Sequence, residues 1–298
     1  DDTEHELTYP APTPAEWISY DIPLSDFAGL ASTEHLAQLI MVKAPLGTMF
    51  VDNVFYYKEP VKLDLTVVLE GPFNGFNMNK NLNPTYLPLD QPYDVSPWNY
   101  NGDENVGSIP NTNVVDWVLI ELRDASSAAQ ANSATMIGQQ AAFLLRNGSV
   151  VGLDGMSDLI FDVTILEDLF VVIWHRNHLS VLSASALERT NGLYSYSFAT
   201  GADAAYGGNL KSLGGGVWGM YGGNGLADQQ IDDLDKTTVW DLETGESGYL
   251  QSDFNMDGQA DNADKNEVWL LNNGTNISEY QLIWEDNFDM DGVPDADK

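Results

Sequence analysis

The chain has 298 residues, of which 43% are hydrophobic and 11% aromatic, so it is long and apolar enough to fold around a sizeable core. Its formal net charge of −33 argues against nucleic acid and anionic membranes as partners, because a strongly acidic surface repels phosphate. The absence of cysteine excludes disulfides, and no apolar run reaches the ~18 residues of a membrane span.

Residues 1–60 contain three runs that predict strands, at residues 17–24, 36–42 and 48–57, because apolar, β-branched and aromatic residues dominate them. The segments EWISYDIPLSDFAGL, LAQLIMV and MFVDNVFYYK resemble the last strands of galactose-binding-like jelly rolls attached to secreted polysaccharidases. The resemblance implies the closing strands of a jelly roll whose opening strands are missing. We therefore expect a piece of a longer protein, with these strand edges covered by the next domain or by a second copy of the chain.

Residues 61–222 predict an antiparallel β-sandwich, because short apolar runs recur between turn residues. Arg146-Asn147-Gly148 lies between two such runs and predicts a hairpin with a type I′ turn, which needs the positive φ that Asn and Gly tolerate. Residues 125–140 predict either a loop or one short helix. The nine predicted strands span residues 61–69, 114–122, 141–145, 150–153, 159–166, 169–174, 179–183, 194–198 and 217–221.

Several segments of this body also resemble a known family: VVDWVLIELRD, AAFLLRNGSVVGLDG, VVIWHRNHLSVLSA, YSFATGADAAYGG and GVWGMYGG. They are similar to a β-sandwich unit found near the C-termini of large secreted proteins of Bacteroidota, which usually leave the cell by type IX secretion. The resemblance covers residues 61–273. It implies an extracellular or cell-surface protein, because the unit occurs in adhesins, haemagglutinin-like proteins and enzyme tails and is often followed by calcium-loop repeats.

Residues 71–106 form a long loop rich in Asn, Pro and aromatic residues. A loop of this length inside a sandwich is either functional or tightly packed. Exposed rings would stack on sugars, so Tyr86, Trp98 and Tyr100 are candidate glycan-binding residues. Two alternatives remain open, because the rings would equally well cover the core or contact another protein chain.

The sequence contains no recognised set of catalytic residues. His175 and His178, in the run HRNH at a strand end, would face opposite sides of that strand, so we expect polar pairing rather than metal binding or acid–base catalysis. Asp116 and Glu121 would also face opposite sides, ~16 Å apart by strand rise, which does not favour a glycosidase carboxylate pair. Arg123 lies on the face of Glu121 and predicts a salt bridge. We therefore expect a protein that is not an enzyme.

Residues 253–264 have the spacing of an EF-hand calcium loop, with Asp in place of Glu at the last position. Calcium takes about six to eight oxygen ligands, so a loop wrapped around it must present an oxygen at nearly every second residue. Gly258, at position 6, permits the sharp turn, and Gln259 offers its backbone carbonyl at position 7. The predicted Ca2+ ligands are Asp253, Asn255, Asp257, Gln259, Asp261 and Asp264.

A second copy of this loop lies 29 residues earlier, at residues 224–235. Leu226 and Gln229 stand where the complete loop has its position-3 ligand and its glycine, so this copy is degraded. Each copy runs into the sequence D-K-x-x-V-W, which predicts a short exit helix that buries Val and Trp. The predicted ligands of the degraded loop are Asn224, Asp228, Gln230, Asp232 and Asp235.

A third, shorter copy near the end of the chain resembles a thrombospondin type 3 calcium repeat as much as an EF-hand loop. The whole acidic segment, residues 223–298, resembles dockerins, which pair two Asp-terminated loops without a first helix. The degraded first loop and the third copy depart from that pattern. The predicted ligands of the third copy are Asn287, Asp289, Asp291, Val293, Asp295 and Asp297.

Together these features predict a mainly β protein in three parts: the closing strands of a jelly roll (1–60), an antiparallel β-sandwich (61–222) and a calcium-binding segment with short helices (223–298). The expected function is that of a calcium-stabilised structural or adhesive component of an extracellular fibre, sheath or adhesin, with further copies of itself as the partner. The alternative is an accessory glycan-binding part of a secreted polysaccharide-degrading enzyme, with an extracellular polysaccharide as the partner. Neither interpretation involves insertion into a membrane.

Overall fold

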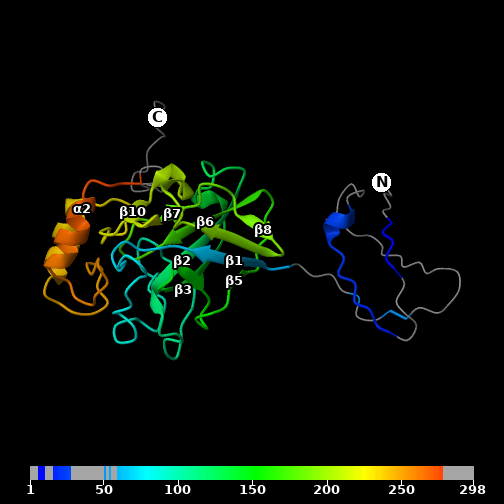
Figure 1. The fold of residues 1–298 in the computed structure, drawn as a ribbon, viewed down its shortest axis with the longest axis horizontal. Helices are drawn as coiled ribbons and strands as arrows, with labels where there is room; N and C mark the ends of the chain where they lie inside the picture. Colours follow the sequence, from blue (N-terminus) through cyan, green and yellow to red (C-terminus); the bar gives the residue numbers. More distant parts are fainter. Residues whose placement is uncertain (1–5, 11–15, 28–49, 52–53, 55–58, 278–298) are drawn as a thin grey trace, which may run out of the picture. The chain divides into compact units, whose positions relative to one another are not determined.

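The computed structural model describes residues 6–10, 16–27, 50–51, 54 and 59–277. The chain divides into two compact units, Asp1–Tyr57 and Lys58–Lys298 (Figure 1). The described residues of the first unit contain one 3-10 helix, η1 (Leu24–Phe27), and no strand. Within the described ranges of both units, no helix has the length and apolar character needed to cross a membrane.

The strands predicted in the first unit are only partly covered by these ranges. The run at residues 17–24 carries no strand among the residues described there, and Trp17 within it is 74% exposed. The ring centroids of Tyr9 and Tyr20 lie 5.4 Å apart in an edge-to-face contact. The predicted strand at residues 36–42 and most of the one at residues 48–57 lie outside the described residues, so the jelly-roll interpretation stays a prediction.

The described part of the second unit is mainly β, as predicted. Nine strands form one curled mixed sheet, and two more form a separate hairpin (Figure 1). The strands are β1 (Val61–Thr66), β2 (Val114–Ala125), β3 (Met136–Leu145), β4 (Ser149–Val151), β5 (Leu159–Phe161), β6 (Asp168–Trp174), β7 (Val181–Leu182), β8 (Glu188–Thr190), β9 (Leu193–Ser197), β10 (Lys211–Gly214) and β11 (Val217–Gly219).

The main sheet follows the order β7-β6-β2-β3-β4-β1-β9-β8, and β5 pairs with β1 off this path. The pairs are antiparallel except that of β1 with β9, which run parallel with Leu63 opposite Tyr194. The core is therefore one curled, mixed sheet, where the sequence predicted an antiparallel β-sandwich. The reason is that periodicity shows which residues share a face of a strand, but not which distant strand lies beside it.

Each of the nine predicted strands overlaps an observed one. The two strands that were not predicted, β8 and β10, are short, and neither contains a buried residue. A short strand with little buried surface has no apolar alternation for sequence analysis to detect. Periodicity therefore located the strands that build the core and missed those at its margin.

β2 is the central element of the core. It is buried along almost its whole length, which is typical of a strand covered on both faces and explains its near-continuous run of apolar residues. The rings of Trp117 on β2 and Phe143 on β3 lie 4.1 Å apart between centroids. Complete burial of a large apolar side chain contributes roughly 3 kcal/mol to stability, so this pair is a principal anchor of the sheet.

The hairpin predicted at Arg146-Asn147-Gly148 joins β3 to β4. The predicted type I′ turn is wrong, because of these three residues only Gly148 has a positive φ, at 92°. The N–H of Gly148 donates to the carbonyl of Leu145 at 2.8 Å. The connection is therefore a type I-like turn closed by a left-handed glycine, the usual form of a three-residue hairpin loop.

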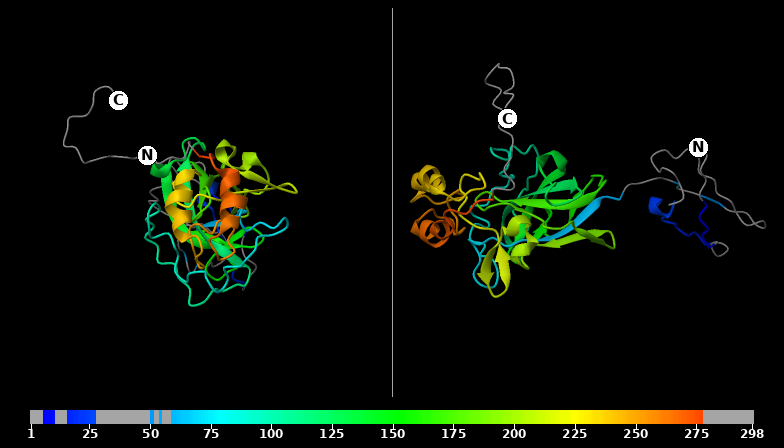
Figure 2. Two further views of the ribbon diagram at one scale, coloured as in Figure 1. Left: turned by 90° about the vertical axis from the view of Figure 1, so that its left-hand side faces the viewer. Right: turned by 90° about the horizontal axis from the view of Figure 1, so that it is seen from above.

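The helices among the described residues of the second unit are short. One of them, η2, lies within residues 125–140, where a loop or a short helix was predicted. Figure 2 shows the two helical stretches that follow the predicted calcium loops lying side by side at one end of the sheet. The helices are η2 (Ser133–Thr135), η3 (Ala202–Ala204), η4 (Tyr206–Gly208), η5 (Asp235–Trp240), α1 (Asp241–Glu243), η6 (Asp264–Trp269) and α2 (Leu270–Asn272).

The predicted exit helices are confirmed as η5–α1 and η6–α2, each a π-helical stretch that continues as an α-helical turn. The Val and Trp of both D-K-x-x-V-W sequences are buried, as predicted. Val268 and both Trp residues help to form a second hydrophobic cluster, distinct from the main core. Its buried members are Leu179, Ile231, Trp240, Phe254, Val268, Trp269 and Ile277.

Candidate metal centre

In the complete loop, residues 253–264, side chains of predicted ligands accept hydrogen bonds from the backbone of the same loop. Asp253 accepts the N–H groups of loop positions 5 and 6, both at 2.9 Å, and Asp264 accepts those of positions 3 and 9, at 3.0 and 2.8 Å. Asn255, Asp257 and Asp261 each accept the N–H two residues further along, at 2.9, 3.0 and 2.6 Å. The oxygen side chains of these five residues therefore all bond the backbone of their own loop.

The degraded loop, residues 224–235, has the same hydrogen-bond framework. Asn224 accepts the N–H of position 5 at 3.2 Å, and Asp235 accepts those of positions 3 and 9, at 3.0 and 2.8 Å. Asp228 and Asp232 each accept the N–H two residues on, at 3.0 and 2.7 Å. The backbone conformation agrees as well, because positions 4 and 6 have positive φ in both loops.

Gln229 shows how the degraded loop keeps this shape without a glycine at position 6. Its φ of 69° lies in the left-handed region, which is costly for a residue with a side chain. The buried side chain offsets that cost, because Oε1 accepts the N–H of Ser180 at 2.8 Å and its hydroxyl at 2.7 Å. Gln229 therefore anchors the first loop to the segment that leads into β7.

The two loops and their exit helices contact each other in an equivalent way. Trp240, in the first exit helix, donates from Nε1 to the carbonyl of Asp261 at 2.8 Å. Trp269, at the equivalent place in the second, donates to the carbonyl of Asp232 at 2.9 Å. Both acceptors stand at position 9 of the opposite loop. Each loop is therefore held by the exit helix of the other loop, so the two loops and their helices form one structure.

Burial changes the acidity of three predicted ligands. The side chains of Asp235, Asp253 and Asp264 belong to residues with no exposed surface. Loss of water raises the pKa of Asp235 to about 7, that of Asp253 to about 7 and that of Asp264 to about 6, with neighbouring carboxylates adding to the effect. Only Asp253 has a cation acting on it, because the charge of Arg176 opposes the rise of its pKa without cancelling it. A cation among these carboxyl groups would favour the ionised form and lower these pKa values.

In the part of the chain that the structure describes, no group of three or more His, Cys, Asp or Glu side chains is gathered tightly enough to hold a metal ion. The loop carboxylates instead face the backbone N–H groups of their own loops. An ionised carboxylate has about four acceptor sites, so these bonds leave lone pairs free. The ligands predicted between Asn287 and Asp297 lie outside the described residues. Calcium binding therefore stays a prediction.

The run HRNH, which follows β6 directly, joins the sheet to the loop pair. Asn177 Nδ2 donates to the backbone carbonyl of Asp253, the first residue of the complete loop, at 2.8 Å. The carbonyl of Asn177 accepts the N–H of Asn224, the first residue of the degraded loop, at 3.1 Å. Arg176 adds a bond from Nη1 to the carbonyl of Leu250. One segment thus positions the start of both loops.

His175 and His178 contact each other, with 3.1 Å between their Nδ1 atoms, so the prediction that they face opposite sides was wrong. The strand ends at Trp174, and alternation of faces does not extend beyond it. His175 Nε2 lies 3.2 Å from Asp116 Oδ2, and His178 Nε2 accepts the N–H of Gly71 at 3.2 Å. Desolvation lowers the pKa of His175 and takes that of His178 well below its usual value, so both rings are neutral near pH 7.

Acidification is expected to weaken the fold through these two histidines. Below about pH 6.5 the unfolded chain binds protons that the buried rings do not, so each ring removes up to about 1.4 kcal/mol of unfolding free energy per pH unit until its lowered folded pKa is reached. His178→Gln should therefore give a shallower decline between pH 7 and pH 5, measured by urea unfolding beside the wild type. Parallel curves would show that His178 does not titrate on unfolding in this range.

Asp116 is the buried acceptor at the centre of the contacts that the run HRNH makes. Its carboxylate accepts from Arg176 Nε at 3.0 Å and from the Tyr249 hydroxyl at 2.6 Å. Desolvation raises its pKa, but the charge of Arg176 and the contact with His175 outweigh this, so the pKa of Asp116 is lowered overall. The guanidinium of Arg176 also lies 4.2 Å from the centroid of the Tyr249 ring. These contacts are polar pairing, as the sequence predicted for HRNH.

Glu121 forms the predicted salt bridge with Arg123, at 2.7 Å between Oε1 and Nε. Its other oxygen accepts from Trp174 Nε1 at 3.1 Å. Glu121 and Asp116 therefore belong to separate buried clusters, each with its own cation. Nothing in this arrangement resembles two carboxyl groups that flank a common substrate.

The three candidate glycan-binding rings have different surroundings. Trp98 is half-buried, and its ring centroid lies 5.0 Å from that of the buried Tyr93. Tyr100 is also half-buried and donates to Glu104 Oε1 at 2.6 Å. Tyr86 is the most exposed of the three, at 37%. Tyr86 lies against Gly258 of the complete loop. If Gly258 carried a side chain, its Cβ atom would lie 2.7 Å from Cε2 of Tyr86.

Comparison of the chain with known protein families, curated proteins and solved structures finds no match. The family resemblances drawn from short segments therefore stay predictions. The oxygen spacing in the sequence predicts the loops but not the residues that join them to the sheet, Asn177 and Gln229. The available signal was the run of four polar residues directly after an apolar strand, since buried polar groups need partners from elsewhere in the fold.

Proposed function

We propose that the chain is a calcium-stabilised structural or adhesive module of an extracellular protein, and that it is not an enzyme. One observation carries this proposal: the two loops share a single framework of hydrogen bonds and positive φ angles, although one of them has lost a ligand and its glycine. Carboxylate, amide and backbone carbonyl oxygens are the ligands that Ca2+ prefers. Residues 253–264 would bind it more tightly than residues 224–235.

The position of the loops supports a structural role for the ion. Asn177 and Arg176 attach the loop pair to the end of β6, so an ion that orders the loops also orders one end of the sheet. The charge of −33 favours a setting that is rich in divalent cations. Outside the cell, millimolar calcium saturates even weak sites. The proposed partners are further copies of the chain or of the longer protein that contains it.

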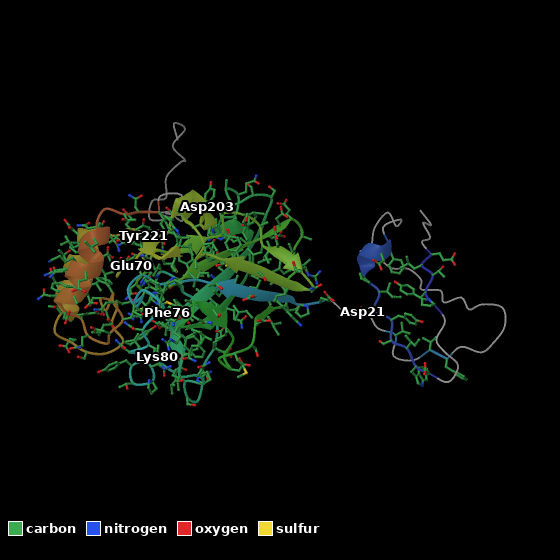
Figure 3. All side chains as sticks on the ribbon, viewed as in Figure 1. Asp21, Glu70, Phe76, Lys80, Asp203 and Tyr221 are labelled. Carbon is green, nitrogen blue, oxygen red and sulfur yellow. The ribbon has the colours of Figure 1, made fainter. Side chains whose placement is uncertain are left out.

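Calcium titration calorimetry on the purified chain tests this function. Asp257→Ala is expected to weaken the tighter site about tenfold or more, because it removes a charged ligand. Asp228→Ala should have a smaller effect, since its loop already lacks an oxygen side chain at Leu226. Asp203→Ala is the matched control, because it removes one exposed carboxylate outside the loops (Figure 3).

Two outcomes would contradict the proposal. The absence of any calcium-binding heat in the wild type would remove its basis. Equal effects of Asp257→Ala and Asp203→Ala would show that the ion responds only to the overall negative charge. Equal effects of Asp257→Ala and Asp228→Ala would leave calcium binding in place and show that the ranking of the two loops is wrong.

Accessory glycan binding is the second candidate function, and exposed rings in residues 71–106 favour it. Phe76 is 87% exposed and Tyr86 37%. Half-buried Trp98 and Tyr100 offer less surface to a sugar, which makes this the weaker proposal. Retention of the chain on a polysaccharide matrix, lost on Tyr86→Ala, would favour it. Self-assembly of the chain without sugar would favour the structural role.

A further inference from the structure

We propose that Lys211 and Asn272 react to form an intramolecular isopeptide bond, with Glu70 as the group that transfers the protons. The three side chains come from separate parts of the chain: Glu70 lies beyond the end of β1, Lys211 begins β10, and Asn272 ends α2. They meet where the sheet faces the loop pair, and Figure 3 shows Glu70 there beside Tyr221. This inference does not depend on calcium binding.

The reacting groups already touch. Lys211 Nζ donates to Asn272 Oδ1 at 2.6 Å, so the amine lies against the carboxamide that it would attack. Glu70 bridges the two, because Oε1 accepts from Lys211 Nζ and Oε2 accepts from Asn272 Nδ2 at 2.6 Å. A single carboxylate therefore contacts both the nitrogen that must lose protons and the nitrogen that must gain one.

The orientation of the Asn272 amide is determined by its neighbours. Nδ2 faces two acceptors, the Glu70 carboxylate and the carbonyl of Gly222 at 2.8 Å. Exchanging the two amide atoms would place an oxygen against both acceptors and an NH2 group against the ammonium of Lys211. The N–H of Gly222 also donates to Glu70 Oε2 at 3.0 Å and holds the carboxylate in place.

The surroundings favour reaction over hydrolysis. Asn272 is only 2% exposed, and the side chains of Lys211 and Glu70 are 23% and 12% exposed. The Tyr221 ring centroid lies 5.9 Å from Lys211 Nζ and covers one side of the amine. Little water therefore reaches the carbonyl. Holding two reactants in contact raises their effective concentration by several orders of magnitude, which compensates for the low reactivity of an amide.

The bond would form by transamidation. Glu70 takes a proton from the Lys211 ammonium, and the neutral Nζ attacks Cγ of Asn272. Glu70 then gives that proton to Nδ2 and takes a second one from Nζ, while the Cγ–Nδ2 bond breaks and ammonia leaves. Ammonia carries the second proton away as ammonium and restores the Glu70 carboxylate. The products are one secondary amide and one ammonium ion, with no oxidation or reduction and no cofactor.

The consequence would be a covalent ring. The amide would close the chain between residues 211 and 272, a span that contains both loops and both exit helices. The chain has no cysteine, so no disulfide can do this. Closing a long loop restricts the unfolded chain and stabilises the fold, by the same reasoning that applies to disulfides.

Intact mass spectrometry of the purified, folded chain tests the proposal. The wild type is expected to be lighter than its sequence by one ammonia, about 17 Da, and a digest should contain one peptide pair joined between Lys211 and Asn272. Glu70→Gln and Lys211→Arg should restore the full mass. Lys80→Arg is the matched lysine control and should stay lighter, because Lys80 Nζ bonds only the carbonyl of Thr112 among the contacts that the structure describes (Figure 3).

Two further variants separate this reaction from alternatives. Asn273 precedes Gly274, and an Asn-Gly sequence can itself lose ammonia by cyclising, so Asn273→Ala should leave the mass deficit unchanged. Asn272→Asp should condense with loss of water, about 18 Da, instead of ammonia. A wild type at its full sequence mass would overturn the proposal, and so would a deficit that disappears in Asn273→Ala. The intact mass of the wild type can be measured whether or not any of the variants folds.

Discussion

Removing calcium with a chelator is expected to lower the melting temperature of the second unit by roughly 10 °C. A ligand that binds only the folded state contributes about 4 kcal/mol at a free concentration 1,000 times its dissociation constant. Without the ion, the ionised forms of Asp235, Asp253 and Asp264 stand buried and close to other carboxylates, as the raised pKa values show. Calorimetry with and without chelator, at constant ionic strength, measures this shift.

The controls address the high charge of the chain. Any salt screens a net charge of −33, so sodium chloride at the ionic strength of the calcium buffer sets the baseline. Magnesium at the same concentration should stabilise less, because it is smaller and demands octahedral geometry. Asp257→Ala should reduce the calcium-dependent shift, whereas Asp203→Ala should leave it intact. Melting curves that coincide with and without chelator would contradict a structural role for calcium.

Arg176→Met is expected to cost about 3–5 kcal/mol of unfolding free energy, the largest effect of any single substitution proposed for this chain. The guanidinium and the Asp116 carboxylate are almost fully buried, with side chains 2% and 0% exposed. Methionine fills a similar volume but leaves Asp116 charged without its main cation. It also removes the bond to the carbonyl of Leu250, which helps to hold the loop pair on the sheet. Urea unfolding in saturating calcium measures the loss.

Two variants isolate the contribution of the buried charge. Arg189→Met breaks an exposed pair with Glu59, whose side chains are 44% and 55% exposed, and should cost at most about 1 kcal/mol. The double variant Asp116→Asn/Arg176→Met removes the stranded charge as well, so it should be more stable than Arg176→Met alone. If Arg176→Met lowers the unfolding free energy no more than Arg189→Met does, the buried pair of Arg176 and Asp116 is not a main source of stability.

Local sequence patterns correctly predicted the strands and helices whose formation depends mainly on residues close together in the chain. The continuous apolar runs of β2 and β6 and the alternation in β1 were sufficient to place them. The repeated D-K-x-x-V-W sequence predicted both exit helices and their buried Val and Trp residues. In each case the signal lies within about a dozen consecutive residues, the range over which periodicity and capping act.

Two of the wrong predictions concern residues just beyond the end of a strand. His175 and His178 were assigned to opposite faces, but the strand ends one residue before them and the chain turns. The hairpin at Asn147-Gly148 was placed correctly, but its turn type depends on how β3 and β4 pair. Both assignments require the backbone path beyond the strand, which residue types alone do not specify.

By itself, the sequence determined the positions of the core strands, the 29-residue repeat of the two loops and the oxygen spacing that predicts calcium. Only the tertiary structure decided the parallel pairing of β1 with β9, the anchoring of both loops by Asn177 and the meeting of Glu70, Lys211 and Asn272. Glu70 and Asn272 stand 202 residues apart in the chain. Contacts over such distances arise from the packing of the whole unit, because no short segment carries the information about which remote side chain will lie beside it.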